Sequence, residues 1–451
     1  MSHEAHFFEV MRTRLVGEQV SGSSAFAHLC RLRAEYYEIY VLPSLATCVD
    51  DALTLCPDFR EELFEKLLAF FEPRLSAIGS LEPPSVPQNQ EKCFGGNVAV
   101  LGVGLAYPTR DFFYAKMPRT FQDLTITIGD LNLAFDASAL AVQPPREKCT
   151  IAYELADVDQ ENNVCIRAAL AERGQKDTTK GIGQQLRGAG VDLPEDALRR
   201  AIGVFERQGD ADFFLPKDAV TFLQDQLDHW LAPHAFASEV PTEEHILHIA
   251  VLRSVALNLI AAIDHFEDQL VQAWTKPKAV VTAHYVITLD KLAAAAPTLE
   301  IVQQLIHHAN FPAQVIEWRT LGIIDDTYSS EDVVIATEIG LKLNERYAHL
   351  PADTQYFPDL EPVLASLFPE LDQSLDGWLV KSENFQALCT LLPQFQGAVT
   401  AIYIDPPFNK GGPAGTRKAS GKGGDGDFAY SVNYQAASWV TLLANRLELA
   451  R

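Results

Sequence analysis

Residues 398–408 read AVTAIYIDPPF, and this stretch determines the expected fold of the C-terminal region. The run from Ala398 to Ile404 is apolar and rich in β-branched residues, which is typical of a strand buried on both faces of a parallel sheet. Two prolines follow Asp405, and because proline fixes its φ angle and donates no backbone hydrogen bond, they end the strand in a rigid corner. Ligands of open α/β sheets bind at that edge. We therefore expect a binding site at the carboxyl end of a central strand.

The corner presents a carboxylate, proline carbonyl oxygens and an aromatic ring in one fixed array. Asp405 can accept one hydrogen bond from an exocyclic amino group, and the carbonyl oxygen of Pro406 can accept another. Phe408 offers a face on which an unstacked base can lie, a contact worth about 1 to 3 kcal/mol. Fixed acceptors of this kind stabilise the charge that develops on the nitrogen as a methyl group arrives. The array therefore suits methyl transfer to an amino group and requires neither a metal ion nor an acid–base pair.

The tetrapeptide at residues 405–408 resembles the D-P-P-[YF] catalytic motif of amino-group DNA methyltransferases, in particular the β-class adenine-specific enzymes of restriction-modification type. Its flanks at residues 379–388, 427–430, 433–435 and 438–439 are similar to the same family, and a weaker similarity lies at residues 212–218. The resemblance implies transfer of a methyl group from S-adenosyl-L-methionine to the N6 amino group of a flipped adenine in double-stranded DNA. The implied catalytic residues are Asp405, Pro406, Pro407 and Phe408, and the implied cofactor contacts are Asp405, Ser382, Glu383 and Asn384.

Three points leave alternatives open. The family more often has tyrosine where this chain has Phe408, which preserves stacking but loses a hydroxyl group. Ser382 is also a favoured residue for the N-cap of the helix that follows, and the two roles are compatible. Cytosine N4 methylation is an alternative activity, although serine would be more typical at position 405.

The family places a glycine-rich cofactor turn of the type F-x-G-x-G after the catalytic motif, and residues 409–451 contain none. Only one or two strands of a Rossmann-like sheet are encoded, and a lone parallel strand would leave its backbone groups unpaired. We therefore expect the N-terminal portion of a larger methyltransferase that is inactive alone. Its partner would be the missing half in trans or a restriction or defence subunit. The alternative is a non-catalytic DNA-binding or scaffold subunit.

A basic segment follows the motif. Residues 409–424 contain no acidic residue and four basic ones, in a chain of formal net charge −24: Lys410, Arg417, Lys418 and Lys422. These side chains are candidates for contacts with DNA phosphates. A solvated linker without a role is the competing interpretation.

The remaining sequence predicts a mixed α/β (α+β) chain with four regions. They are a helical N-terminal region at 1–85, an antiparallel β subdomain at 91–170, a helical region at 193–355, and the start of a Rossmann-like methyltransferase domain at 375–451. Strands are expected at residues 98–101, 112–115, 124–128, 131–135, 150–155 and 164–166, and a long helix at about 244–273.

Composition excludes several classes of protein. With 451 residues, 47% of them hydrophobic and 21% charged, the chain suits several globular domains. No run approaches the roughly 18 consecutive apolar residues of a membrane span, so no membrane partner is expected. The N-terminus lacks the features of a secretory signal, which predicts a cytoplasmic protein. The seven cysteines form no C-x-x-C pair and His245 and His248 do not match H-E-x-x-H, so no metal site is expected.

Overall fold

The computed structural model describes residues 2–75, 111–115, 121–142, 151–159, 163–171, 179–208, 213–235, 242–296, 298–338, 340–407 and 436–451. The chain forms two compact units, and the second, residues 278–382, is inserted in the first, which comprises residues 1–277 and 383–451. The mixed α and β composition predicted from the sequence is confirmed. The predicted helical region 193–355 crosses the boundary between the two units at residue 277. The predicted boundary between the regions 1–85 and 91–170 lies outside the described residues.

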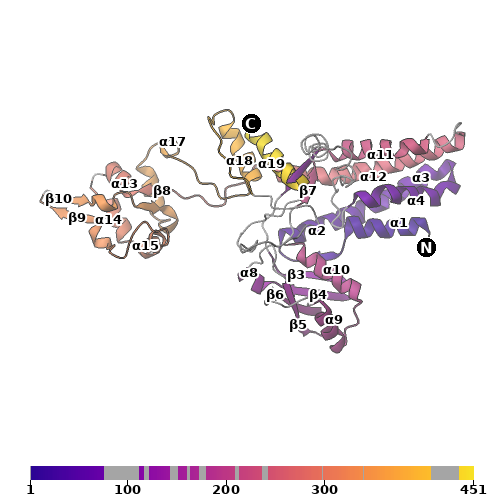
Figure 1. Cartoon of the computed structure of the whole chain (residues 1–451), viewed down its shortest axis with the longest axis horizontal. Helices are drawn as coiled ribbons and strands as arrows, with labels where there is room; N and C mark the ends of the chain where they lie inside the picture. The colour runs from indigo at the N-terminus through magenta and orange to yellow at the C-terminus, as the bar shows by residue number, and fades with distance from the viewer. Residues whose placement is uncertain are drawn as a thin grey trace, which may run out of the picture. The chain divides into compact units, whose positions relative to one another are not determined.

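Helices from residues 3–71 and 219–275 pack into a helical body, in which α11 lies along α12 and α1 along α4 (Figure 1). Its core is formed by fully buried side chains such as Phe7, Phe64 and Leu259. The helices are α1 (His3–Met11), α2 (Ala25–Glu35), α3 (Leu42–Ala52), α4 (Arg60–Phe71), α11 (Ala219–Ala235) and α12 (Glu243–Thr275). Two π-helical segments, Arg12–Val16 and Tyr36–Val41, follow α1 and α2.

The predicted long helix is confirmed as α12. Its N-terminus is capped by Thr242, whose hydroxyl accepts a hydrogen bond from the backbone nitrogen of His245 at 3.1 Å. By length and composition α12 could cross a membrane, with 39% of its apolar window buried in the protein. Its buried residues, among them Val255 and Ile260, belong to the core shared with α3, α4 and α11. This packing is that of a core helix.

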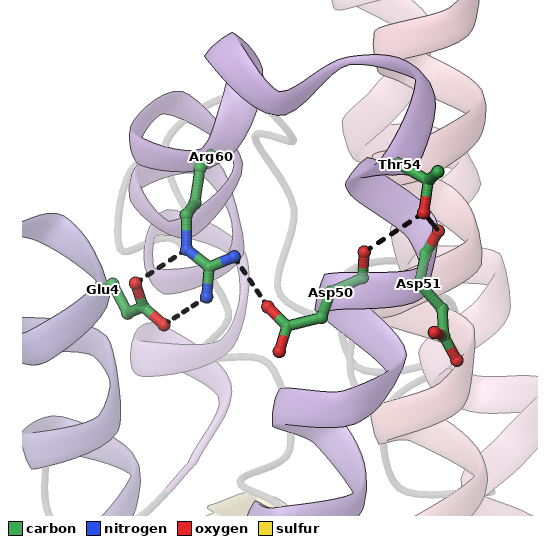
Figure 2. A network of polar contacts seen from close by, with 5 residues as sticks. All are labelled: Glu4, Asp50, Asp51, Thr54 and Arg60. Atoms are coloured by element: carbon green, nitrogen blue, oxygen red, sulfur yellow. Dashed lines mark hydrogen bonds and ion pairs between the residues drawn. The ribbon is translucent and has the colours of Figure 1, made fainter.

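An ion-pair network joins three helices of the body. Arg60 on α4 binds Glu4 of α1 through two nitrogens, with Nε–Oε2 and Nη2–Oε1 distances of 2.8 and 2.7 Å, and its Nη1 reaches Asp50 of α3 at 2.7 Å (Figure 2). These bonds raise the pKa of the guanidinium above its ordinary value, so Arg60 stays charged. The paired geometry fixes the position of α1 against α4 more specifically than apolar packing would.

A five-stranded sheet, in the order β1-β3-β4-β6-β5, forms the second part of the first unit. One face packs against α10 (Glu195–Glu206), where Phe135 and Phe205 stack with ring centroids 4.8 Å apart. The strands are β1 (Gln19–Ser21), β3 (Leu124–Ile128), β4 (Leu131–Asp136), β5 (Ile151–Val158) and β6 (Asn163–Leu170), with helices α8 (Ser138–Val142) and α9 (Thr179–Gly188) beside them.

The prediction of an antiparallel subdomain at 91–170 is confirmed for the pairs β3–β4 and β5–β6 but wrong for the pair that joins them. β4 and β6 are parallel, and β1 joins the sheet from the N-terminal region through Gln19 opposite Thr127. Residues 112–115 form β2, which pairs instead with β7 (Phe213–Pro216). Alternation of apolar residues identifies a strand locally, whereas its partner depends on contacts distant in sequence. The strand expected at 98–101 lies outside the described residues.

The C-terminal helices α18 (Asn384–Phe395) and α19 (Ala436–Ala450) return to this unit and pack near the β2–β7 ribbon (Figure 1). Phe385 of α18 stacks on Trp274 at the end of α12, with centroids 5.6 Å apart and planes at 10°. This stack and the buried Ala115 and Leu215 form a small core of their own. The ribbon therefore serves as the docking surface for the end of the chain.

The second unit has a core centred on Trp318, which is fully buried and donates its indole N–H to the carbonyl oxygen of Pro351 at 2.8 Å. Two antiparallel strand pairs, β8–β11 and β9–β10, accompany its helices. Its elements are β8 (Val286–Thr288), α13 (Leu289–Ala295), α14 (Glu300–Ile306), α15 (Phe311–Thr320), β9 (Val334–Thr337), β10 (Gly340–Leu343), β11 (Pro351–Asp353), α16 (Glu361–Ser366) and α17 (Leu371–Ser374).

Among the described residues of the first unit, Glu267 is the acidic residue that is fully buried. Glu267 on α12 is 1% exposed, and its Oε2 atom has no hydrogen-bond partner. Burial raises the pKa of this carboxyl group to about 8, although the positive charge of Arg33 partly opposes the shift. Glu267 is therefore mostly protonated at neutral pH.

Replacing Glu267 with glutamine should remove a pH dependence of stability. Between the ordinary pKa of a glutamate and about 8, the native state binds one proton more than the unfolded state, so stability falls as pH rises, by about 1.4 kcal/mol per pH unit. Between pH 6 and pH 8 we expect the free energy of unfolding of Glu267→Gln to rise by roughly 2 kcal/mol relative to that of the unmodified protein, as measured by urea unfolding. Glu243→Gln, exposed at the start of the same helix, is the control. Parallel pH profiles for Glu267→Gln and the unmodified protein would contradict the assignment.

Candidate active site

The apolar run that ends at the catalytic corner forms no strand. Residues 399–406 belong to no helix or strand, and Val399, Ile402 and Tyr403 are 54%, 56% and 94% exposed. The prediction of a strand buried on both faces is therefore wrong for the described structure. The reason is physical: a parallel strand needs hydrogen-bonding neighbours, and the described residues of 375–451 contain two helices and no strand.

Among the described residues, one hydrogen bond anchors the corner. The indole Nε1 of Trp439, on α19, donates a hydrogen bond to the carbonyl oxygen of Pro407 at 2.9 Å. Pro406 and Pro407 are half-buried, whereas Asp405 is exposed. Asp405 makes no hydrogen bond or ion pair in the described part of the chain. Its carboxylate is thus accessible on a backbone that Trp439 holds in place.

The position of α19 depends on a buried asparagine. Asn445 is 2% exposed, and its side-chain amide bonds the edge of β2, accepting from the backbone nitrogen of Tyr114 at 2.8 Å and donating to the carbonyl oxygen of Phe112 at 3.1 Å. The side chain thereby imitates the hydrogen-bond pattern of a neighbouring strand. Because both bonds are buried, they fix the helix in register along the ribbon.

Arg446, the next residue of α19, connects the helix to the predicted cofactor residues. It is 7% exposed, and its Nη2 contacts Oε1 of Glu383 at 2.7 Å, while its Nε donates to Oδ1 of Asn384 at 2.8 Å. Its Nη1 donates to the carbonyl oxygen of Tyr114 at 3.1 Å. The guanidinium also lies 5.4 Å from the ring centroid of Phe385. A single side chain therefore joins α19, β2 and the start of α18.

The three predicted cofactor residues, Ser382, Glu383 and Asn384, have different roles in the structure. Glu383, rather than Ser382, is the N-cap of α18, and its carboxylate accepts from the backbone nitrogen of Gln386 at 3.0 Å. Oε1 binds Arg446 and Oε2 binds this nitrogen, so both carboxylate oxygens of Glu383 have partners. Ser382 is exposed at the end of the second unit, and Asn384 has one side-chain atom engaged by Arg446. Ser382 loses the cap because the longer carboxylate of the next residue reaches the helix N-terminus and a cation together.

Sequence reasoning missed Asn445 and Arg446. The available signal was their place in an otherwise apolar segment, between Leu442–Leu443 and Leu447. Polar side chains on such a helix are candidates for buried hydrogen bonds. Phe408 and the predicted DNA-contacting residues Lys410, Arg417, Lys418 and Lys422 lie outside the described residues.

Removal of the Arg446 side chain should strongly destabilise the first unit. Arg446→Ala leaves the mostly buried Glu383 carboxylate without its cation, and breaking such a pair costs about 3 to 5 kcal/mol. The matched control is Arg253→Ala, because Arg253 and its partner Asp228 are both about half exposed and such pairs contribute less than about 1 kcal/mol. Denaturant unfolding compares the two. Equal losses of stability in both variants would refute the structural role of Arg446.

Comparison with known proteins gives one partial similarity. Over 76 residues, 17% of this chain, the sequence is 38% identical to the probable type III restriction-modification enzyme HindVI Mod subunit of Haemophilus influenzae. The aligned segment spans 8% of the length of that relative. No family model and no solved structure matches the chain. The similarity supports a relationship to restriction-modification proteins.

Proposed function

We propose that this chain carries the catalytic corner of a DNA methyltransferase that modifies the N6 amino group of a flipped adenine. The observation that carries the proposal is the accessible carboxylate of Asp405, which precedes two prolines anchored through the Pro407 carbonyl to Trp439. The partial similarity to a restriction-modification Mod subunit supports the same class of activity.

The chemistry follows from the hydrogen bonds that the corner can accept. Adenine carries two N–H groups on its exocyclic nitrogen, and the Asp405 carboxylate and the Pro406 carbonyl oxygen are the proposed acceptors. Trp439 already occupies the Pro407 carbonyl, which leaves the Pro406 oxygen as the free acceptor beside Asp405. Both acceptors draw electron density toward the nitrogen and stabilise its developing positive charge. Phe408 is the proposed stacking ring for the base, a role the chain retains without the tyrosine hydroxyl.

S-adenosyl-L-methionine would supply the methyl group. Asp405 fits a contact with this cofactor because its carboxylate has no partner among the described residues. Glu383 does not fit, because both its oxygens are engaged by Arg446 and the α18 N-terminus. We assign Glu383 a positioning role and retain Asn384 and Ser382 as proposed cofactor contacts.

The unpaired segment indicates what the site still needs. Residues 399–404 are largely apolar and solvent-exposed. We propose that strands outside residues 1–451, on the same polypeptide or on a partner in trans, pair with the run at 398–404. Double-stranded DNA is the proposed substrate, with the basic segment after the motif contacting phosphates, and a restriction subunit is a further proposed partner.

A non-catalytic DNA-binding or scaffold subunit is the second candidate. It is favoured by one observation, the absence of paired strands from the described residues of 375–451. The two candidates differ in whether Asp405 is needed for methylation, and the following experiment separates them.

We expect Asp405→Ala to abolish methylation while leaving DNA binding intact. The variant is made in a protein that also contains the strands proposed to pair with residues 398–404, either on the same polypeptide or added in trans. Transfer of labelled methyl groups to duplex DNA is then measured. Because one fixed acceptor is lost, we expect the rate of methyl transfer to fall about 100- to 1,000-fold. Asp326→Ala, at an exposed aspartate of the second unit, is the matched control and should retain full activity. Chromatography of digested DNA distinguishes N6-methyladenine from N4-methylcytosine. Undiminished methylation by Asp405→Ala would favour the scaffold.

A further inference from the structure

A large cavity in the first unit is separate from the Asp405 corner. It measures about 1230 Å³ and lies between α2, β1, α10 and the C-terminal half of α12. Apolar side chains, among them Val20, Phe26 and Leu29, form part of its wall. Its volume is that of a site for a small organic molecule rather than for a single ion.

Two buried polar atoms without partners belong to residues that line this cavity, and a third belongs to Tyr37, which interacts electrostatically with both. Glu267 lines it, and its Oε2 atom is unpaired although the residue is 1% exposed. The Nε atom of Arg33, which also lines the cavity, is buried without a hydrogen bond. The hydroxyl of the fully buried Tyr37, whose pKa is affected by both groups, is unpaired as well. Buried polar groups normally have partners, so this cluster indicates a bound group that supplies them.

Six arginines and five glutamates line the cavity, and because Glu267 is mostly protonated at neutral pH, the balance of charge is positive and favours an anion. Arg33 and Arg207 both line the cavity, and their mutual repulsion adds to burial in lowering the pKa of Arg207. Arg33 has no ion pair within the described residues, and Glu267 does not neutralise it at pH 7 because burial keeps that carboxyl group protonated. Two neighbouring guanidinium groups form the arrangement that suits phosphate recognition.

We propose that this cavity binds a phosphate monoester of nucleotide size. The phosphate lies between Arg33 and Arg207 and accepts the hydroxyl proton of Glu267 in a hydrogen bond, and the ring system lies against the apolar wall near Phe26. The site goes beyond the proposed methyltransferase function and does not use Asp405.

The test measures binding to the full chain by isothermal titration calorimetry at pH 7 with three probes. Adenosine 5′-monophosphate should bind more tightly than inorganic phosphate, and adenosine should bind at least tenfold more weakly than the monophosphate. Arg33→Gln and Arg207→Gln should each weaken binding of the monophosphate at least tenfold. Arg200→Gln is the matched control, because Arg200 lines the same cavity, pairs with Glu18 at 3.1 Å and is not a proposed phosphate contact. The affinity of this variant for the monophosphate should stay within twofold of the unmodified protein.

Glu267→Gln adds a readout that a merely structural role would not change. The groups that face Glu267 are Arg33, Tyr37 and Asp264. We expect none of them to change charge between pH 7 and 9, whereas Glu267 loses its proton over this range. We expect the unmodified protein to lose about fivefold in affinity over this range and Glu267→Gln to lose none. Circular dichroism confirms folding of each variant. Absence of binding by the monophosphate, equal binding of adenosine, or unchanged affinity in folded Arg33→Gln would overturn the proposal.

Discussion

The buried guanidinium of Arg446 is the interaction on which the C-terminal part of this structure depends. It binds the N-cap carboxylate of α18, the side chain of Asn384 and a carbonyl oxygen of β2 from one position. Arg446 lies on the helix that also carries Trp439, so the same docking places the indole against the Pro407 carbonyl. The corner is therefore held by a chain of contacts that begins nearly 40 residues later in the sequence.

A second constraint acts on the residues just before the corner. Backbone N–H and C=O groups require partners, and a single extended segment cannot supply its own. Residues 398–404 are consequently exposed in spite of a composition that favours burial. Within the described residues, the site has its positioning contacts, whereas residues 398–404 have no neighbouring strand. This combination explains why the residues proposed for the chemistry and the residues that stabilise the fold are different.

Local sequence patterns predicted much of the fold. The strands at Phe112–Ala115 and Leu124–Ile128 and the long helix α12 follow directly from the spacing of apolar residues. Pairing was not predictable in the same way, because the parallel contact of β4 with β6 and the addition of β1 join segments far apart in the chain. At the site, Asp405 and its prolines were identified from local chemistry. The competition between Ser382 and Glu383 for the N-cap was decided by Arg446, a residue 63 positions beyond Glu383.

Hydrogen–deuterium exchange of the amides at residues 399–404 tests the central claim most directly. In residues 1–451 alone, we expect exchange close to the rate of an unfolded peptide, since these amides have no partners among the described residues. When the strands that complete the sheet are present, the same amides should become protected by several orders of magnitude. Strong protection in residues 1–451 alone, or none in the completed protein, would contradict the account.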